Sequence, residues 1–214
     1  MKETFQHLKE KKKRRIIDAC ISEFAEMGYD LSSTYRIIKK AGISKGGLYE
    51  YISTKEELFL FTVEYAYQAL YEHIEQAIRE ETPRPPEDLL DRINLASEKA
   101  ISFYVANPDY VRLIVRTHHI QDSLLSDKVR RIFRSHFNHL FGDADTSRVF
   151  CDREKMVDLV TWILQKTRYD FLLELHKGGD FETIRKNYLS NWRFYLGVLR
   201  TGLYSAPGPE EPAP

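Results

Sequence analysis

The chain has 214 residues, 43% of them hydrophobic and 30% charged, and its 32 basic and 32 acidic residues cancel to a formal net charge of zero. This composition suits one or two globular domains with a buried core. No stretch reaches the roughly 18 apolar residues of a membrane-spanning helix, and residues 1–15 lack the apolar segment of a secretory signal, so we expect a cytoplasmic protein with no membrane partner.

The charge is unevenly distributed along the chain. Residues 1–55 hold twelve Lys/Arg against seven Asp/Glu, whereas the remainder holds 20 against 25. A basic end on a balanced chain favours one module that faces a polyanion and a second module with a different role.

Helix signals dominate throughout, so the sequence predicts an all-α fold. The first helix is expected over about 9–27, because its apolar residues recur at three- and four-residue steps. Gly28 suits the position just after the end of that helix. Ser32 or Ser33 then caps a short helix through Lys40, and Ser44 caps another to about Tyr51. Two short helices joined by the tight turn 41–43 predict a helix-turn-helix.

The later elements follow from capping and breaking residues. The run Ser53-Thr54-Lys55-Glu56 matches a capping box and starts a long helix over roughly 54–80, which a proline cluster at 83–86 ends. Further helices are expected at 87–106, 108–117, 122–141, 152–177 and 180–203. The final stretch, SAPGPEEPAP, lacks apolar residues and is predicted to be disordered.

No metal site, disulfide or cofactor is expected. Cys20 and Cys151 have no CxxC spacing and no histidine cluster around them, and Cys20 falls within an apolar stripe. The adjacent His118 and His119 would point about 100° apart on a helix, and no familiar ligand spacing completes a set around them.

The segment 44-SKGGLYEYI-52 carries the strongest functional signal. Leu48 and Ile52, four residues apart, hold it against the preceding helices. Two glycines cost about 1 kcal/mol each in a helix interior, but they leave a bare backbone that can approach the floor of a DNA groove. Outward-facing lysine and tyrosine side chains can then reach bases or phosphates. A glycine pair or a lone surface lysine is ordinary by itself, so the signal lies in the combined spacing.

Residues 14–59, RRIIDACISEFAEMGYDLSSTYRIIKKAGISKGGLYEYISTKEELF, resemble the N-terminal DNA-binding domain of TetR-family transcriptional regulators. The positions in step with the family pattern are Ile17, Ala19 or Cys20, Phe24, Gly28, Tyr29, Ala41, Gly42, Ser44, Lys45, Gly46, Leu48, Tyr49, Lys55, Glu56 and Leu58.

The resemblance implies DNA contacts at several positions of this segment. Lys45 and Gly46 would face base edges, Gly47 would let the helix sit close, and the phosphate contacts would come from tyrosines and Lys55, at the start of the next helix. The preceding helix would be anchored through its first residues. The expected DNA-binding residues are Ser33, Thr34, Tyr35, Ser44, Lys45, Gly46, Gly47, Tyr49, Tyr51 and Lys55.

Three positions depart from the family pattern. Ile38 replaces a small alanine, which predicts looser packing, and Ile52 replaces a phenylalanine. Glu50 would either repel phosphate or accept a hydrogen bond from a cytosine amino group. Glu50 is also the one support for an alternative, an adaptor protein that has lost DNA binding.

After residue 60 lie 20 of the 27 aromatic residues. The resemblance implies a helical bundle that encloses a small-molecule pocket and forms a homodimer through the last two helices. Those helices carry apolar stripes, and the sequence does not separate the stripe that packs the core from one that meets a second subunit: Leu159, Ile163, Lys166/Thr167 and Phe171 on one helix, and Tyr188, Trp192, Tyr195, Leu196 and Leu199 on the other. The candidate pocket residues, apolar walls with a few polar tips, are Phe103, Tyr104, Arg112, Trp162, Gln165 and Tyr169.

The expected function is a ligand-responsive repressor that a mostly apolar effector, a fatty acyl or aromatic compound, releases from a double-stranded DNA operator. The expected division is a DNA-binding domain over 1–53, a ligand-binding and dimerisation bundle over 54–204 and a tail over 205–214. The alternative class, an enzyme in a helical bundle, lacks support: the sequence has no nucleophile–base pairing, no Glu-x-x-His pair and no glycine-rich phosphate loop after a strand.

Overall fold

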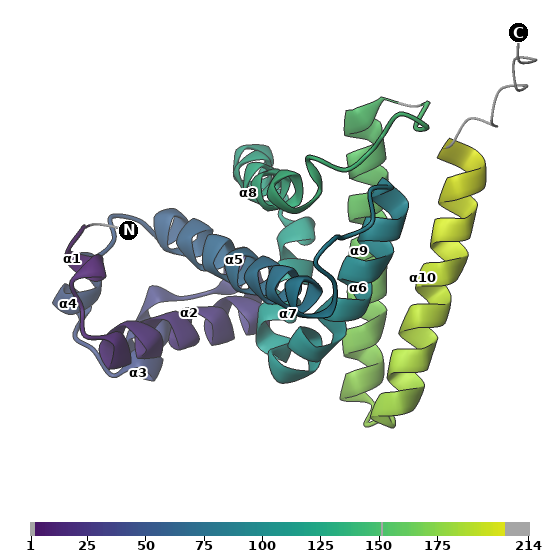
Figure 1. Ribbon diagram of the computed structural model, residues 1–214. Coiled ribbons are helices and arrows are strands. Elements are labelled where there is room, and N and C mark those ends of the chain that lie inside the picture. The colour runs from purple at the N-terminus through teal and green to yellow at the C-terminus, as the bar shows by residue number, and fades with distance from the viewer. Residues whose placement is uncertain (1–2, 151, 204–214) are drawn as a thin grey trace, which may run out of the picture. The chain divides into compact units, whose positions relative to one another are not determined.

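The computed structural model describes residues 3–150 and 152–203, and over these ranges it is helical and contains no β-strand (Figure 1). This confirms the all-α prediction. The expectations for Cys151 and for the tail concern residues outside these ranges. Within them, no helix has the length and apolar content needed to cross a membrane.

The helices follow one another closely along the chain: α1 (Glu3–Gln6), α2 (Glu10–Leu31), α3 (Thr34–Ala41), α4 (Lys45–Tyr49), α5 (Lys55–Glu81), α6 (Leu89–Ala106), α7 (Pro108–Arg116), a 3-10 turn η1 (Thr117–His119), α8 (Ser123–Phe141), α9 (Arg153–His176) and α10 (Phe181–Leu203). The sequence missed α1 and placed most other boundaries within two residues.

Gly28 interrupts α2 where the sequence predicted the helix to stop. Its backbone adopts φ 69° and ψ −175°, a conformation that glycine reaches without a Cβ clash. Regular helix before this point buries one apolar face, including Ile16, Cys20 and Phe24. Burial raises the pKa of the Cys20 thiol to about 12, although a hydrogen bond to Thr62 lowers it somewhat. Cys20 is therefore a core residue with an unreactive thiol.

The chain divides into two compact units. One contains the described residues up to 73 together with 102–139, and the other contains 74–101 together with the described residues from 140 onward. Within the first unit, α7 packs against α2 and buries Val111, Leu113 and Ile114. The predicted boundary at residues 53/54 does not coincide with this division, and it stays a prediction about function.

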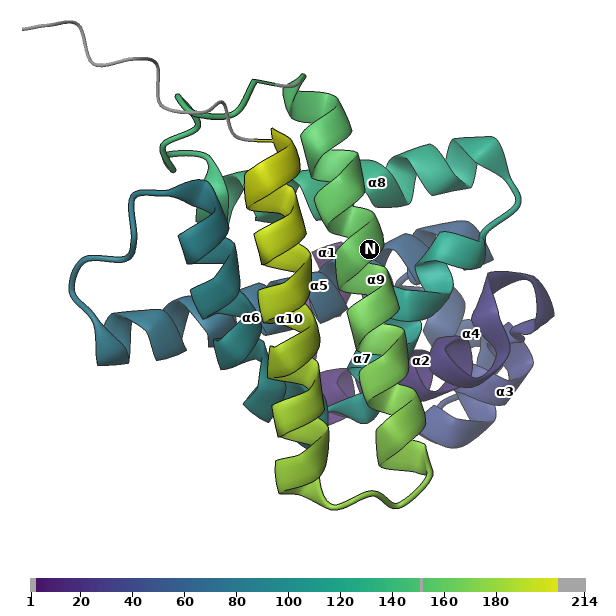
Figure 2. The same ribbon diagram turned by 90° about the vertical axis from the view of Figure 1, so that its right-hand side faces the viewer.

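In the second unit, α9 and α10 lie side by side (Figure 2). Both predicted apolar stripes turn mainly inward in this unit: the buried members are Ile163, Thr167, Phe171, Tyr188, Trp192, Leu196 and Leu199. Several large apolar side chains on the same two helices are exposed, including Leu159 of the predicted stripe: Leu159, Trp162, Tyr169, Leu173, Phe194 and Val198. We call this set the α9–α10 exposed stripe.

Candidate nucleic-acid interface

Helix α4 is a five-residue helix with a side-chain cap at its start. The Ser44 hydroxyl accepts a hydrogen bond from the Gly47 N–H at 3.0 Å, which confirms Ser44 as the N-cap. The helix ends at Tyr49, two residues before the predicted end. A helix this short is not stable alone, so its position depends on tertiary contacts. Leu48 and Ile52 supply two of them, both fully buried.

The turn between α3 and α4 is held from both sides. Gly42 lies in the left-handed region with φ 62° and ψ 43°, where glycine is favoured. From α2, the Arg15 guanidinium donates to the carbonyl oxygens of Ala41 at 2.9 Å and Gly42 at 3.3 Å. Arg15 thereby satisfies carbonyls that the end of α3 leaves open.

Exposed residues lie at the start of α3 and along α4. Lys45 and Gly46 are exposed, and the exposed fractions of Tyr35 and Tyr49 are 72% and 40%. The hydroxyl oxygens of Thr34 and Tyr49 lie 3.5 Å apart, which brings the two helices together at these residues. Glu50 is also exposed. We call Thr34, Tyr35, Lys45, Gly46 and Tyr49 the α3–α4 face.

The structure accounts for glycine at position 47 but not at position 46. A Cβ at Gly47 would lie 3.1 Å from the Ser44 hydroxyl oxygen, so the cap itself favours glycine there. A Cβ at Gly46 would meet no atom of the chain within 4 Å. Packing within the described chain therefore gives no reason for glycine at position 46.

Two predicted phosphate contacts have other partners. Tyr51 is buried, with 4% of its surface exposed, and its hydroxyl accepts from the Lys12 ammonium at 3.1 Å. The Lys55 ammonium donates to the carbonyl oxygens of Tyr29, Asp30 and Ser32 at 2.8, 3.3 and 3.3 Å. It also lies 4.5 Å from the Tyr29 ring centroid. The structure thus directs Tyr51 into the core and Lys55 to the carbonyl end of α2.

The start of α3 relies on a residue that sequence reasoning missed. Ser33 makes no side-chain cap; instead its N–H donates to the carboxylate of Glu23 at 2.9 Å. Glu23 is fully buried and also accepts from Arg36 Nε at 2.7 Å, with the Lys40 ammonium 3.4 Å away. Its position beside Phe24, on the apolar side of α2, was the available signal, because a charge there needs buried partners.

Opposing effects act on the Glu23 carboxyl. Burial raises the pKa of this carboxyl. Hydrogen bonds from the Ser33 N–H and the Arg36 guanidinium, together with the charges of Arg36 and Lys40, lower the pKa by more than burial raises it. The net result is a pKa below the ordinary value of a glutamic acid. Glu23 is therefore an ionised link between α2 and α3.

The capping box of α5 is shifted by one residue from its predicted register. The Thr54 hydroxyl accepts from the Glu57 N–H at 3.0 Å, and the Glu57 carboxylate accepts from the Ser53 N–H at 2.6 Å. Thr54 is therefore the N-cap of α5, and Glu57 binds back to the residue before the cap.

The six candidate pocket residues are divided equally between the two compact units. Phe103 and Tyr104 are buried in the first unit, where Arg112 pairs with Asp109. In the second unit, Trp162 and Tyr169 are 61% and 52% exposed, and Gln165 is half-buried. Trp162 and Tyr169 belong to the α9–α10 exposed stripe, and their placement in a pocket wall stays a prediction.

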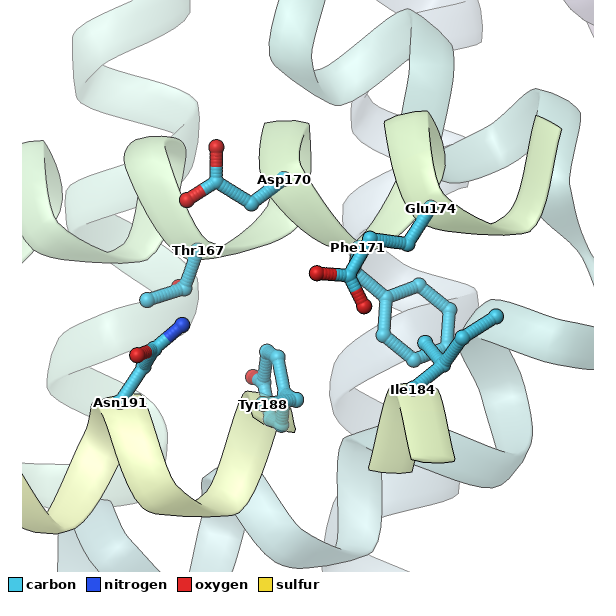
Figure 3. A pocket seen from close by; sticks show the side chains of 7 residues that line it. All are labelled: Thr167, Asp170, Phe171, Glu174, Ile184, Tyr188 and Asn191. Carbon is cyan, nitrogen blue, oxygen red and sulfur yellow. The ribbon is translucent and has the colours of Figure 1, made fainter. Parts of the chain in front are cut away.

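A small hollow lies between α9 and α10. Figure 3 shows Thr167, Asp170, Phe171 and Glu174 of α9 facing Ile184, Tyr188 and Asn191 of α10. Its cavity volume of about 10 Å³ has room for about one water molecule. This hollow is too small for an organic effector.

A capped recognition helix behind a tight glycine turn, with a long helical region after it, defines a helix-turn-helix protein. Residues 16–60 match the family described as bacterial regulatory proteins, tetR family. The fold is also that of a TetR-family regulator from Chloroflexus aurantiacus, with TM-score 0.63 and 21% identity over 96% of this chain and 99% of that one. The N-terminal segment thus matches the DNA-binding domain of the TetR family, and the described chain has the fold of solved TetR-family regulators.

The chain is also similar to other regulators of transcription, and fatty acid metabolism or an acyl-CoA appears in the description of some of them. The fatty acid metabolism regulator protein of Bacillus subtilis is 23% identical over 180 residues, 77% of this chain and 90% of the relative. The transcriptional activator FasR of Mycolicibacterium smegmatis is 25% identical over 122 residues, and the match spans 57% of this chain and 53% of FasR. The solved structure of FadR from Bacillus subtilis, in complex with stearoyl-CoA, has TM-score 0.63 and 18% identity, covering 84% of this chain and 96% of that one. These relatives are regulators of transcription rather than enzymes.

Proposed function

We propose that this regulator is a homodimeric repressor that binds an operator through the α3–α4 face and leaves it when a fatty-acyl effector binds. The observation that carries the proposal is the exposed Lys45–Gly46 surface of the capped helix α4, inside the segment that matches the family. The basic balance of residues 1–55 suits a polyanionic partner.

The proposed contacts divide by position on the α3–α4 face. Lys45 and Gly46 face the floor of the DNA major groove. There Lys45 reaches hydrogen-bond acceptors on the bases, and Gly46 permits close approach of the backbone. Thr34, Tyr35 and Tyr49 take backbone phosphates, together with the half-buried Ser33. Ser44 and Gly47 shape the helix start through the cap. Tyr51 and Lys55 leave the set of direct contacts, because their polar atoms already have partners within the chain.

Two copies of α4 need a second subunit. An operator read in successive major grooves requires recognition helices about 34 Å apart, which a single chain does not supply. The α9–α10 exposed stripe supports dimerisation, since its six large apolar side chains are exposed on two neighbouring helices, and exposed apolar surface marks an interaction site.

The proposed effector class rests on the relatives and on composition. Two relatives are named for fatty acid metabolism or bound to stearoyl-CoA, and the aromatic-rich region after residue 60 suits an apolar ligand. Repression follows if the bound dimer occupies promoter DNA. FasR is named an activator, so a promoter-fused reporter decides the direction: lower expression with the protein supports repression, and higher expression supports activation.

The DNA contact is tested with fragments selected from genomic DNA. Lys45→Ala should weaken specific binding by roughly tenfold or more. It should also reduce the slope of log affinity against log salt concentration by about one, because one phosphate-neutralising charge is lost. Gly46→Ala should leave thermal stability unchanged or slightly higher, yet weaken operator binding. Lys186→Ala, which removes an exposed lysine of α10, is the matched control. Operator affinity unchanged in both the Lys45 and Gly46 variants would contradict the proposed face.

Stearoyl-CoA is the probe for the effector, with free coenzyme A as the control that lacks the acyl chain. We expect stearoyl-CoA to dissociate the protein–operator complex at concentrations where coenzyme A does not. Persistence of the complex at saturating stearoyl-CoA would remove the fatty-acyl part of the proposal and leave DNA binding intact.

A further inference from the structure

We propose that residues 3–8 form an N-terminal clamp that positions the recognition helix α4, with Phe5 and Thr4 as its positioning residues. Phe5 is fully buried, although Glu3, Thr4, Gln6 and His7 around it are exposed. A polar segment that buries a single large ring has one strong anchor, and this anchor lies beside the end of α4.

The ring of Phe5 joins α4 to α5. It meets Tyr51, two residues beyond α4, edge to face with centroids 5.8 Å apart, and it meets Phe61 of α5 in the same way at 5.3 Å. Such edge-to-face pairs are favourable and directional. Removal of the Phe5 ring therefore leaves an unfilled space between Tyr51 and Phe61.

Thr4 acts at the carboxyl end of the same helix. Its hydroxyl donates to the carbonyl oxygen of Glu50, the C-cap residue of α4, at 2.9 Å. Carbonyls at a helix end have no partner within the helix. Thr4 supplies one from a segment more than forty residues earlier in the chain.

Two lysines of α2, Lys12 and Lys13, contact Tyr51 and residues 5–6. Lys12 donates to the Tyr51 hydroxyl at 3.1 Å and lies 5.6 Å from its ring centroid. The Lys13 ammonium lies 5.9 Å from the Phe5 ring centroid and donates to Gln6 at 3.3 Å. Residues 3–8 are thus held on both α2 and the end of α4.

Helix α4 needs such support because its own stability is low. It has five residues, and two of them are glycines, so it gains little from helix formation itself. Ser44 fixes its first turn, and the clamp fixes its last. The inference rests on the proposed function, since a fixed α4 matters for reading an operator.

The first measurement needs no DNA. Amide hydrogen exchange is followed at residues 48–52 in the full chain, for the wild type and for Phe5→Ala, Phe5→Leu, Thr4→Val and His7→Ala. Phe5→Ala should speed exchange there by about tenfold or more, since a buried phenylalanine contributes at least that factor. Phe5→Leu should restore part of the protection, Thr4→Val should act in the same direction more weakly, and the exposed His7→Ala should match the wild type. Unchanged protection in α9 and α10 shows that the chain stays folded.

The second measurement is operator affinity of the same variants. Phe5→Ala should lose about tenfold in specific affinity while stearoyl-CoA binding and the dimer stay unchanged. Wild-type exchange rates at residues 48–52 in Phe5→Ala would overturn the clamp whether or not DNA binds. Faster exchange with unchanged operator affinity would overturn its positioning role. If the wild type binds no DNA fragment, the proposed function fails, and the exchange experiment still decides whether the clamp holds α4.

Discussion

Glu23 is the residue whose ionisation the helix-turn-helix depends on most directly. Its carboxylate supports the start of α3 through the Ser33 N–H and binds Arg36. Glu23→Gln keeps one acceptor but loses the charge opposite Arg36 and Lys40. We expect a loss of about 1–3 kcal/mol in the free energy of unfolding at pH 7, measured by urea denaturation. Arg193→Gln, at an exposed site in α10, is the control.

The same residue predicts a pH dependence. Because folding lowers the pKa of the Glu23 carboxyl, its stabilisation is fully present above the ordinary value of roughly 4.3. It is lost as the pH falls through the lower pKa of the folded state. The difference between wild type and Glu23→Gln should therefore shrink in acid. A difference that stays constant from pH 7 to the acid limit of folding would show that the charge is not its source.

At the level of helices, Lys55 links the start of α5 to the end of α2. Its ammonium meets three carbonyl oxygens and the Tyr29 ring, a favourable position for a cation. Lys55→Met keeps most of the stem and removes the charge. We expect a loss of about 1 kcal/mol in stability, seen as a lower melting temperature, whereas Lys186→Met leaves it unchanged. An unchanged melting temperature together with weaker operator binding would restore the phosphate contact that the sequence suggested.

Sequence periodicity and capping residues were enough to predict most helices, because each depends on neighbours within a few positions. Gly28, Gly42 and Ser44 act locally and were assigned correctly. The sequence missed α1, since one phenylalanine in a polar segment has no periodicity. It gave no sign of the intrachain partners of Tyr51 and Lys55, because those partners lie 39 and 23 to 26 positions away. Long-range pairing of this kind carries no local signal.

The apolar stripes of α9 and α10 show the same limit on a larger scale. Helical periodicity identified the inward residues, but Trp162 was expected in a pocket wall and is 61% exposed. Period alone does not distinguish a surface that covers a ligand from one that another subunit covers. That distinction depends on packing over the whole chain.

For the molecule as a whole, the proposed dimer is open to a direct test. Phe194 is 66% exposed on α10, within the α9–α10 exposed stripe. Phe194→Glu should weaken dimerisation by about tenfold or more, as expected for an aromatic interface anchor, and shift the protein toward monomer in sedimentation experiments. Arg193→Glu, about 100° round the helix, is the matched control. A Phe194→Glu variant that remains as dimeric as the control would place the contact elsewhere.

The packing of α7 against α2 limits how a DNA-binding fragment of this protein can be prepared. Helix α7 lies more than fifty residues beyond α4 in sequence, yet both belong to one compact unit. The compact unit that carries the α3–α4 face is therefore assembled from separate stretches of chain. A fragment cut after the third short helix would leave the α7-facing side of α2 open to solvent, so this unit cannot be excised as a simple N-terminal piece.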